Sequence, residues 1–210
     1  YTNPDFWDPG INKLYQKYKE FCPYLDLPIQ HASDKILNLM NRQKNIGEIR
    51  TMIRNLRSEV PNIAIRTTVM VGFPGETEAD FYELLDFIEE IQFERLGAFK
   101  YSEEEQTEAA EFEDNVPDNI KTDRFDKIMS SQYEISTEFA RNKIDQELNV
   151  IIDEKKNGLA YGRTVWDTPE VDCNVLIDDQ RAGVGKIYKV KITGTEHFDL
   201  VGEIIKEINS

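Results

Sequence analysis

The stretch Arg66-Thr-Thr-Val-Met-Val-Gly-Phe-Pro-Gly-Glu-Thr-Glu78 joins an apolar run, a turn rich in glycine and proline, and the start of a helix. The run from 63 to 71 is rich in β-branched residues and lies between Pro61 and Gly72, which favours a strand buried on both faces. Such a strand, followed at once by a helix, ends at the carboxyl edge of a parallel sheet, where α/β proteins build ligand sites. The stretch therefore predicts an α/β fold with a small-molecule site at this edge.

The turn itself has a conformation that its residues prescribe. Gly72 and Gly75 permit positive φ or a close backbone approach, while Pro74 stiffens the turn. Thr77 and Asp80 have the spacing of a capping box, so a helix begins here, and its amino terminus could hold an anionic group. A plain strand-to-helix connection fits the same pattern, and both interpretations stay open. No Gly-Lys-Ser/Thr follows, so the turn is not a nucleotide P-loop.

Two further strands are expected, one before this stretch in the sequence and one after it. An apolar segment from Leu25 to Ile29 ends at Gln30 and His31, and Arg95 to Tyr101 forms another short run. Helical patterns, including one from Glu48 to Ser58, separate the three strands at lengths typical of βαβ crossovers. We therefore expect the strand tips at Gln30, Gly72 and Tyr101 to meet at one edge of a parallel sheet.

Composition limits the class of protein. The 210 residues are 40% hydrophobic, enough for a real core, and the formal net charge is -15. This charge argues against a general polyanion binder and favours a basic partner. Cys22 and Cys173 lie far apart, which fits a reducing compartment, with the cytoplasm as the default. No apolar run reaches membrane-spanning length, so no membrane partner is expected.

The pattern changes after Ser102. Eight acidic residues and no basic one lie between Glu103 and Asp118, which indicates a solvated loop without the spacing of a calcium site, so no metal is expected. A long helix from Pro117 to about Lys143 follows. From Glu147 onward the chain reads as five short strands separated by turn residues, typical of a small closed barrel. The expected domains are 1–145 and 146–210.

Five segments carry a resemblance to a known family: Tyr24-Leu-Asp-Leu-Pro-Ile-Gln-His-Ala-Ser33, Met40-Asn-Arg42, Arg66 to Glu78, Phe99-Lys-Tyr-Ser-Glu-Glu, and Gly162-Arg-Thr with Pro169-Glu-Val-Asp172. In this order and spacing they resemble the radical S-adenosylmethionine methylthiotransferases. The Pro-Ile-Gln-His-Ala-Ser and Tyr-Ser-Glu-Glu forms resemble the RimO branch, which modifies an aspartate of a small-subunit ribosomal protein. The tRNA-modifying MiaB branch more often reads Gln-Ser-Gly-Ser at the first site.

The resemblance implies a partial (β/α) barrel, an incomplete TIM-like radical domain, followed by a five-stranded TRAM barrel. It implies S-adenosylmethionine and 4Fe-4S clusters as cofactors and a basic small-subunit ribosomal protein as partner, with tRNA less favoured. The expected cofactor-binding residues are Gln30, Arg66, Gly72, Phe73, Gly75 and Glu76. His31 and Tyr101 are expected to face the substrate, although a structural role fits each of them as well, and Arg66 fits a surface ion pair equally.

One departure from the family pattern is chemical. Radical chemistry of this kind needs a Cys-x-x-x-Cys-x-x-Cys loop, because thiolates hold the cluster, and the chain has none. We therefore expect no catalytic residue in this chain, an inactive fragment of a longer enzyme, and self-association through an exposed edge strand. A tRNA-modifying fragment and a purely protein-binding module are the alternatives.

Overall fold

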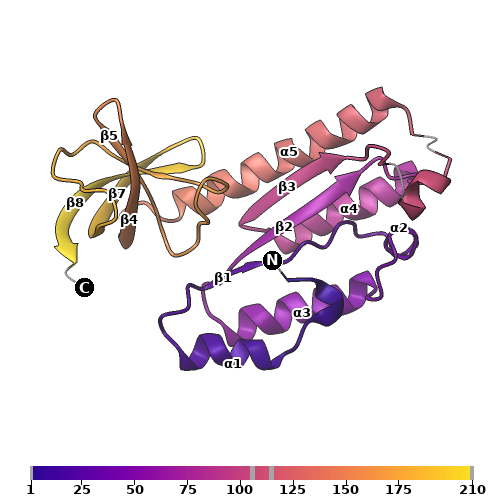
Figure 1. Cartoon of the computed structure of the whole chain (residues 1–210), viewed down its shortest axis with the longest axis horizontal. Helices are drawn as coiled ribbons and strands as arrows, with labels where there is room; N and C mark the ends of the chain where they lie inside the picture. The colour runs from indigo at the N-terminus through magenta and orange to yellow at the C-terminus, as the bar shows by residue number, and fades with distance from the viewer. Residues whose placement is uncertain (1, 105–106, 114–115, 209–210) are drawn as a thin grey trace. The chain divides into compact units, whose positions relative to one another are not determined.

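The computed structural model describes residues 2–104, 107–113 and 116–208, and Figure 1 shows the whole chain. The chain divides into two compact units, Tyr1–Ile135 and Ser136–Ser210. Glu105 and Gln106 of the predicted acidic loop lie outside the described residues, as does Tyr1. Within the described ranges, no helix has both the length and the apolar composition to cross a membrane.

The first unit is built on a three-stranded parallel sheet in the order β1 (Tyr24–Asp26), β2 (Ala64–Val71) and β3 (Arg95–Lys100). Both pairings are parallel, as the sequence predicted. The helices of the unit are η1 (Pro4–Phe6), α1 (Gly10–Lys17), α2 (Asp34–Leu39), α3 (Ile46–Glu59), α4 (Glu78–Ile91) and η2 (Glu108–Glu111), and α5 (Asp118–Arg141) begins in it. The unit therefore has the α/β class expected from its central strand.

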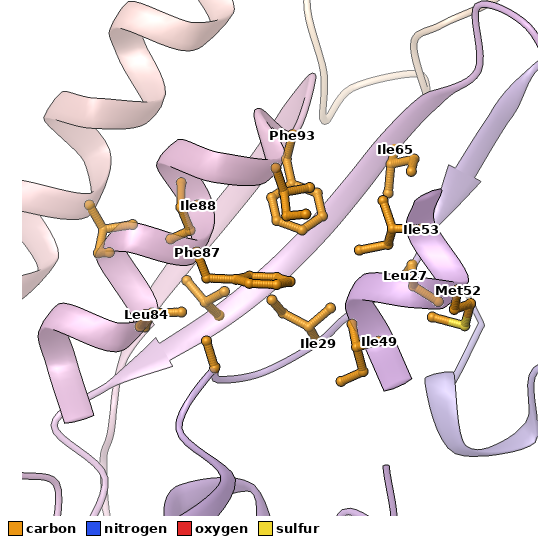
Figure 2. Close-up of a cluster of buried hydrophobic side chains, with 14 of the residues drawn as sticks. Leu27, Ile29, Ile49, Met52, Ile53, Ile65, Leu84, Phe87, Ile88 and Phe93 are labelled. Carbon is orange, nitrogen blue, oxygen red and sulfur yellow. The ribbon is translucent and has the colours of Figure 1, made fainter. Parts of the chain in front are cut away.

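One face of β2 lies in the main core. Figure 2 shows Ile65 of β2 among apolar side chains of α3 and α4, including Ile53 and Phe87. Burial alternates along β2, and every second residue from Arg66 to Met70 is only half-buried. The expectation that this strand is buried on both faces was therefore wrong, because the apolar stripes of α3 and α4 pack on the same side of the sheet.

β1 is shorter than the predicted segment from Leu25 to Ile29. The amide of Leu27 still donates to the carbonyl of Arg66 at 2.8 Å, but the amide of Ile29 turns to Oγ1 of Thr67, and Gln30 adopts a positive φ of 71°. Pairing resumes as a single parallel bridge between Gln30 and Val69. The amide of Thr2 donates to the carbonyl of Asp26 at 2.8 Å, so the chain itself takes up one acceptor on the outer edge of β1.

The second unit is a closed five-stranded barrel in the order β4-β5-β6-β8-β7, which confirms the predicted barrel. Its strands are β4 (Glu147–Lys156), β5 (Leu159–Arg163), β6 (Val175–Ile177), β7 (Ile187–Glu196) and β8 (Asp199–Ile208). Alternate residues of these strands form a core that includes Val150, Ile177 and Val190.

Gly202 of β8 lies where barrel strands pack closely. A Cβ built there would lie 2.5 Å from Cγ1 of Val190 and 2.8 Å from the carbonyl oxygen of Lys191. Real Cβ atoms do not approach so closely, so a side chain at this position would force β7 and β8 apart. Gly194 of β7, in the same ladder, has open space where its Cβ would stand.

Gly202→Ala should therefore destabilise the barrel by about 2 kcal/mol or more, the usual cost of overpacking. Gly194→Ala is the matched control and should change stability by less than about 0.5 kcal/mol. Urea unfolding of the full chain, followed by the indole NMR signal of Trp166, measures both. Equal midpoints for the two variants would contradict this account of the barrel.

Candidate functional site at the carboxyl edge of the sheet

The three strand ends meet at one edge because the sheet is parallel throughout. Gln30 bridges to Val69 of β2, and the amide of Tyr101 donates to the carbonyl of Val71 at 2.9 Å. The turn after β2 begins at the next residue, Gly72. The structure thus brings together the three tips that the sequence placed on a common edge.

The turn from Phe73 to Glu76 is a type II turn. The amide of Glu76 donates to the carbonyl of Phe73 at 2.9 Å, Pro74 occupies the second position, and Gly75 has a φ of 81°. A positive φ at the third position is what this turn type requires, and glycine supplies it without steric cost. Thr77 then caps α4 with the predicted capping box to Asp80.

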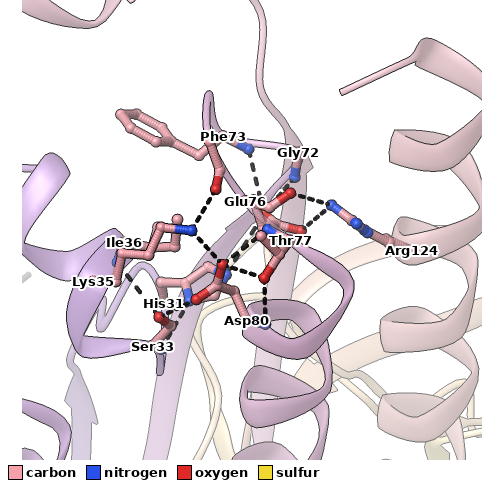
Figure 3. A network of polar contacts seen from close by, with 11 residues as sticks. His31, Ser33, Lys35, Ile36, Gly72, Phe73, Glu76, Thr77, Asp80 and Arg124 are labelled. Atoms are coloured by element: carbon pink, nitrogen blue, oxygen red, sulfur yellow. Dashed lines mark hydrogen bonds and ion pairs between the residues drawn. The ribbon is translucent and has the colours of Figure 1, made fainter. Parts of the chain in front are cut away.

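The carboxylate of Glu76 is the centre of this turn, and Figure 3 shows the groups around it. Its side chain is fully buried. Oε2 accepts from the amides of Gly72 at 2.6 Å and Phe73 at 3.3 Å, and Oε1 accepts from Nη1 of Arg124 on α5 at 2.7 Å. A buried carboxylate needs such partners, since an unpaired one would be strongly destabilising.

These contacts bear on whether the turn can bind an external anion. The sequence suggested that its amides and the start of α4 could hold an external anion. Two of those amides already bind Glu76, and the amides of Thr77 and Asp80 are engaged in the capping box. The protein's own side chains therefore occupy these four amides.

A second carboxylate, that of Asp80, ties the loop after β1 to α4. It accepts from Oγ of Ser33 at 2.6 Å and from Nζ of Lys35 at 2.8 Å, besides the contacts from Thr77. Burial opposes ionisation of Asp80, but the hydrogen bonds from Lys35, Ser33 and Thr77 outweigh it and hold the pKa of Asp80 far below its usual range. Ser33 also caps α2.

His31 is fully buried in the same network. Its Nδ1 accepts from the amide of Ser33 at 2.9 Å, so a neutral ring carries its proton on Nε2, which lies 3.6 Å from Oε2 of Glu76. Tyr101 is also buried, donates its hydroxyl to the carbonyl of Ala109, and contacts the ring of Phe73 edge-on. Both side chains therefore have polar or ring contacts within the protein.

An open cavity of about 320 Å³ lies at this edge. Gln30, Met70 and Phe73 line it together with one basic residue, Arg42, and one acidic residue, Glu108. An amide, apolar surface and a guanidinium match the hydroxyl, ring and carboxylate groups of S-adenosylmethionine, and the volume is at the lower end of small-molecule sites. The residues present therefore fit this cofactor.

Arg66 lies away from the cavity. It stands six residues before Gly72 on β2, roughly 20 Å along an extended strand. Its Nη1 is 3.4 Å from Oδ2 of Asp26, an ion pair on the half-buried sheet face. The structure does not bring Arg66 together with the Gly72 turn.

Two site residues had no assigned role in the sequence analysis. Arg42 belongs to a segment quoted for the resemblance, so its motif was visible but its place in the cavity was not. Arg124 lies 48 residues after Glu76, in the second turn of the long helix α5, and nothing in the local sequence distinguishes it. Such a pairing is apparent only once the helix is placed.

The chain's residues do not fit an iron-sulfur cluster. Cys22 is exposed and belongs to the first unit, while Cys173 is buried in the second. Among the described residues, no three His, Cys, Asp or Glu side chains gather as a metal site would require.

Comparison with known proteins identifies the class. Residues 1–88 match the Radical SAM superfamily and residues 144–205 match the TRAM domain. The solved structure of coproporphyrinogen III oxidase (HemN) from Escherichia coli, a radical SAM enzyme, superposes with a TM-score of 0.55 at 14% identity, covering 78% of this chain and 43% of that one. The fold and the domain matches define a radical SAM region followed by a TRAM domain.

Similar proteins of known name indicate the family within this class. The ribosomal protein uS12 methylthiotransferase RimO of Phocaeicola vulgatus is 44% identical over 98% of this chain and 48% of its own length. The protein of the same name from Geobacter sulfurreducens is 45% identical over 98% of this chain and 46% of its own. The chain belongs to the RimO-type radical SAM methylthiotransferase family, and it spans about half the length of these relatives.

Replacing Glu76 tests the central contact of the site. Glu76→Gln should cost about 3 kcal/mol or more, because the amide leaves Arg124 without its charge partner and turns an NH2 group toward a donor. Chemical denaturation of the full chain measures this. Glu90→Gln, which breaks an exposed pair with Arg50 and Arg54, should cost less than about 1 kcal/mol. A similar cost for both variants would show that the buried pair stabilises the fold no more than the exposed pair does.

The lowered pKa of Asp80 makes the stability of the fold depend on pH in the acid range. Because its folded-state pKa is lowered, its stabilisation is complete above the unfolded value of about 4 and is lost as pH falls below that value. Asp80→Asn should therefore flatten the dependence of unfolding free energy on pH between about 4 and 2. Asp86→Asn, on the exposed side of α4, should keep the steeper slope of the original chain.

Proposed function

We propose that the chain is part of a methylthiotransferase that adds a methylthio group to an aspartate of a small-subunit ribosomal protein. The observation that carries this is the 40–45% identity to uS12 methylthiotransferases over nearly the whole chain. The net charge of -15 supports a basic protein partner over a nucleic acid. A ribosomal substrate places the enzyme in the cytoplasm.

In this proposal the carboxyl edge binds S-adenosylmethionine. Gln30 and Phe73, which line the cavity, would hold the cofactor there, and Arg42 would pair with its carboxylate. Gly72, Gly75 and Glu76 act by fixing the turn that presents Phe73. Arg66, His31 and Tyr101 shape the surroundings, since none of the three lines this cavity. When bound, the cofactor and its cluster supply the radical chemistry, and the chain positions and shields it.

The cluster ligands must come from outside these 210 residues, because the chain has only two cysteines. We assign residues 1–145 to the carboxyl-terminal part of the radical domain and 146–210 to the TRAM domain. The chain by itself then binds and positions without catalysing transfer.

Joining the chain to the cluster-bearing segment of the Phocaeicola vulgatus relative and reconstituting it anaerobically tests the function. Mass spectrometry should find a methylthio group on an aspartate of uS12 and none on tRNA. Modification of tRNA with uS12 unchanged would overturn the proposal in favour of the tRNA-modifying branch.

The same preparation tests the cavity. Phe73→Ala should raise the KM for S-adenosylmethionine about tenfold, the value of roughly 1.4 kcal/mol of lost contact. Phe6→Ala is the control, since this exposed ring lies outside the cavity and should leave the KM unchanged.

A further inference from the structure

The first unit holds a second cavity, of about 460 Å³, on its helical side. One wall comes from residues 7–12 and the other from residues 44–59 along α3. None of its lining residues belongs to the cavity at the carboxyl edge. It is therefore a separate site within the same unit.

Asn12 gives this cavity an unmet hydrogen-bonding need. The residue lines the cavity and is only 2% exposed. Its Nδ2 donates to Oε2 of Glu59 at 3.1 Å, which fixes the orientation of the amide, because the flipped form would set its oxygen against the carboxylate. Oδ1 is then buried with no partner. A buried acceptor of this kind calls for a donor from a ligand.

The charges around Asn12 specify what that donor should be. Two carboxylates, of Glu48 and Glu59, line the cavity against one ammonium, of Lys44. Within the described part of the chain, no lysine or arginine forms an ion pair with Glu59. A cationic donor would satisfy Asn12 and Glu59 at once, whereas an anion would meet two like charges.

The indole of Trp7 distinguishes among cations. It is half-buried and lines the same cavity. A guanidinium is planar, stacks on aromatic rings, and carries several N–H donors in one fork, so it can reach an amide oxygen and a carboxylate together. A single ammonium offers no such flat surface to the indole.

We propose that this cavity binds the guanidinium of an arginine side chain in a polypeptide partner. The cavity is open to solvent, and the strongly acidic chain attracts basic polypeptides. The proposal rests on the proposed function only for the partner's basic character. It gives that partner a contact on the face that carries α1 and α3, apart from the carboxyl edge.

Titration of the chain with N-acetyl-arginine N-methylamide, followed by ¹H–¹⁵N NMR, tests the proposal. The indole signal of Trp7 and the side-chain amide signal of Asn12 should shift together and saturate. Glu59→Gln should weaken binding about tenfold, the expected loss for one charge-assisted pair. Glu83→Gln removes the same charge from an exposed site on α4 and should leave the affinity unchanged.

Two matched ligands complete the test. The citrulline analogue has the same shape without the charge and should bind at least tenfold more weakly. Equal binding of the citrulline analogue, an unchanged affinity in Glu59→Gln, or absence of saturable shifts would overturn the proposal. Tighter binding of free arginine than of the blocked form would overturn the assignment to a polypeptide. Since no transfer chemistry is involved, binding here together with failure to modify uS12 would reject the proposed function alone.

Discussion

The first unit depends on the buried contact between Glu76 and Arg124. The carboxylate of Glu76 accepts from the amides of Gly72 and Phe73 in the turn after β2, and it also accepts from Arg124 of α5. Neither charge can be buried alone without a large cost, so the turn and the helix are stable only together. One side chain thus joins a local turn to an element 48 residues away, and the position of Phe73 at the cavity follows from that joining.

In this arrangement, backbone amides of the turn pair within the protein, and side chains are left to bind a ligand. Helix starts and glycine turns are natural anion sites because their amides lack internal partners. Here Glu76 accepts from the amides of Gly72 and Phe73, and the capping box of Thr77 and Asp80 pairs two more. Recognition at the edge is left to side chains, with Gln30 and Phe73 on the wall of the cavity. Side chains held by a pre-paired backbone give a more rigid site than free amides would.

Local patterns predicted much of this structure. The capping box at Thr77 and the parallel arrangement of three strands follow from residues near one another in sequence. The early end of β1 did not, because it depends on the contact of the Ile29 amide with Oγ1 of Thr67, a residue distant in sequence, and on the positive φ of Gln30. Arg124 could not be found either, since a buried arginine in an amphipathic helix resembles an exposed one until its partner is placed. Sequence patterns therefore predict elements and caps better than long-range charge pairs.

The sheet face opposite the core distinguishes a doubly wound sheet from a partial (β/α) barrel, two architectures that share the βαβ pattern. In a doubly wound sheet, helices cover both faces and every strand is apolar throughout. Arg66 and Thr68 instead alternate with buried residues on β2, and Arg66 pairs with Asp26 across the face opposite the core. A face that keeps an ion pair half-exposed is suited to the interior of an open barrel and would be costly under an apolar helix. The alternation along this one strand is thus a physical reason, independent of any relative, for a partial (β/α) barrel.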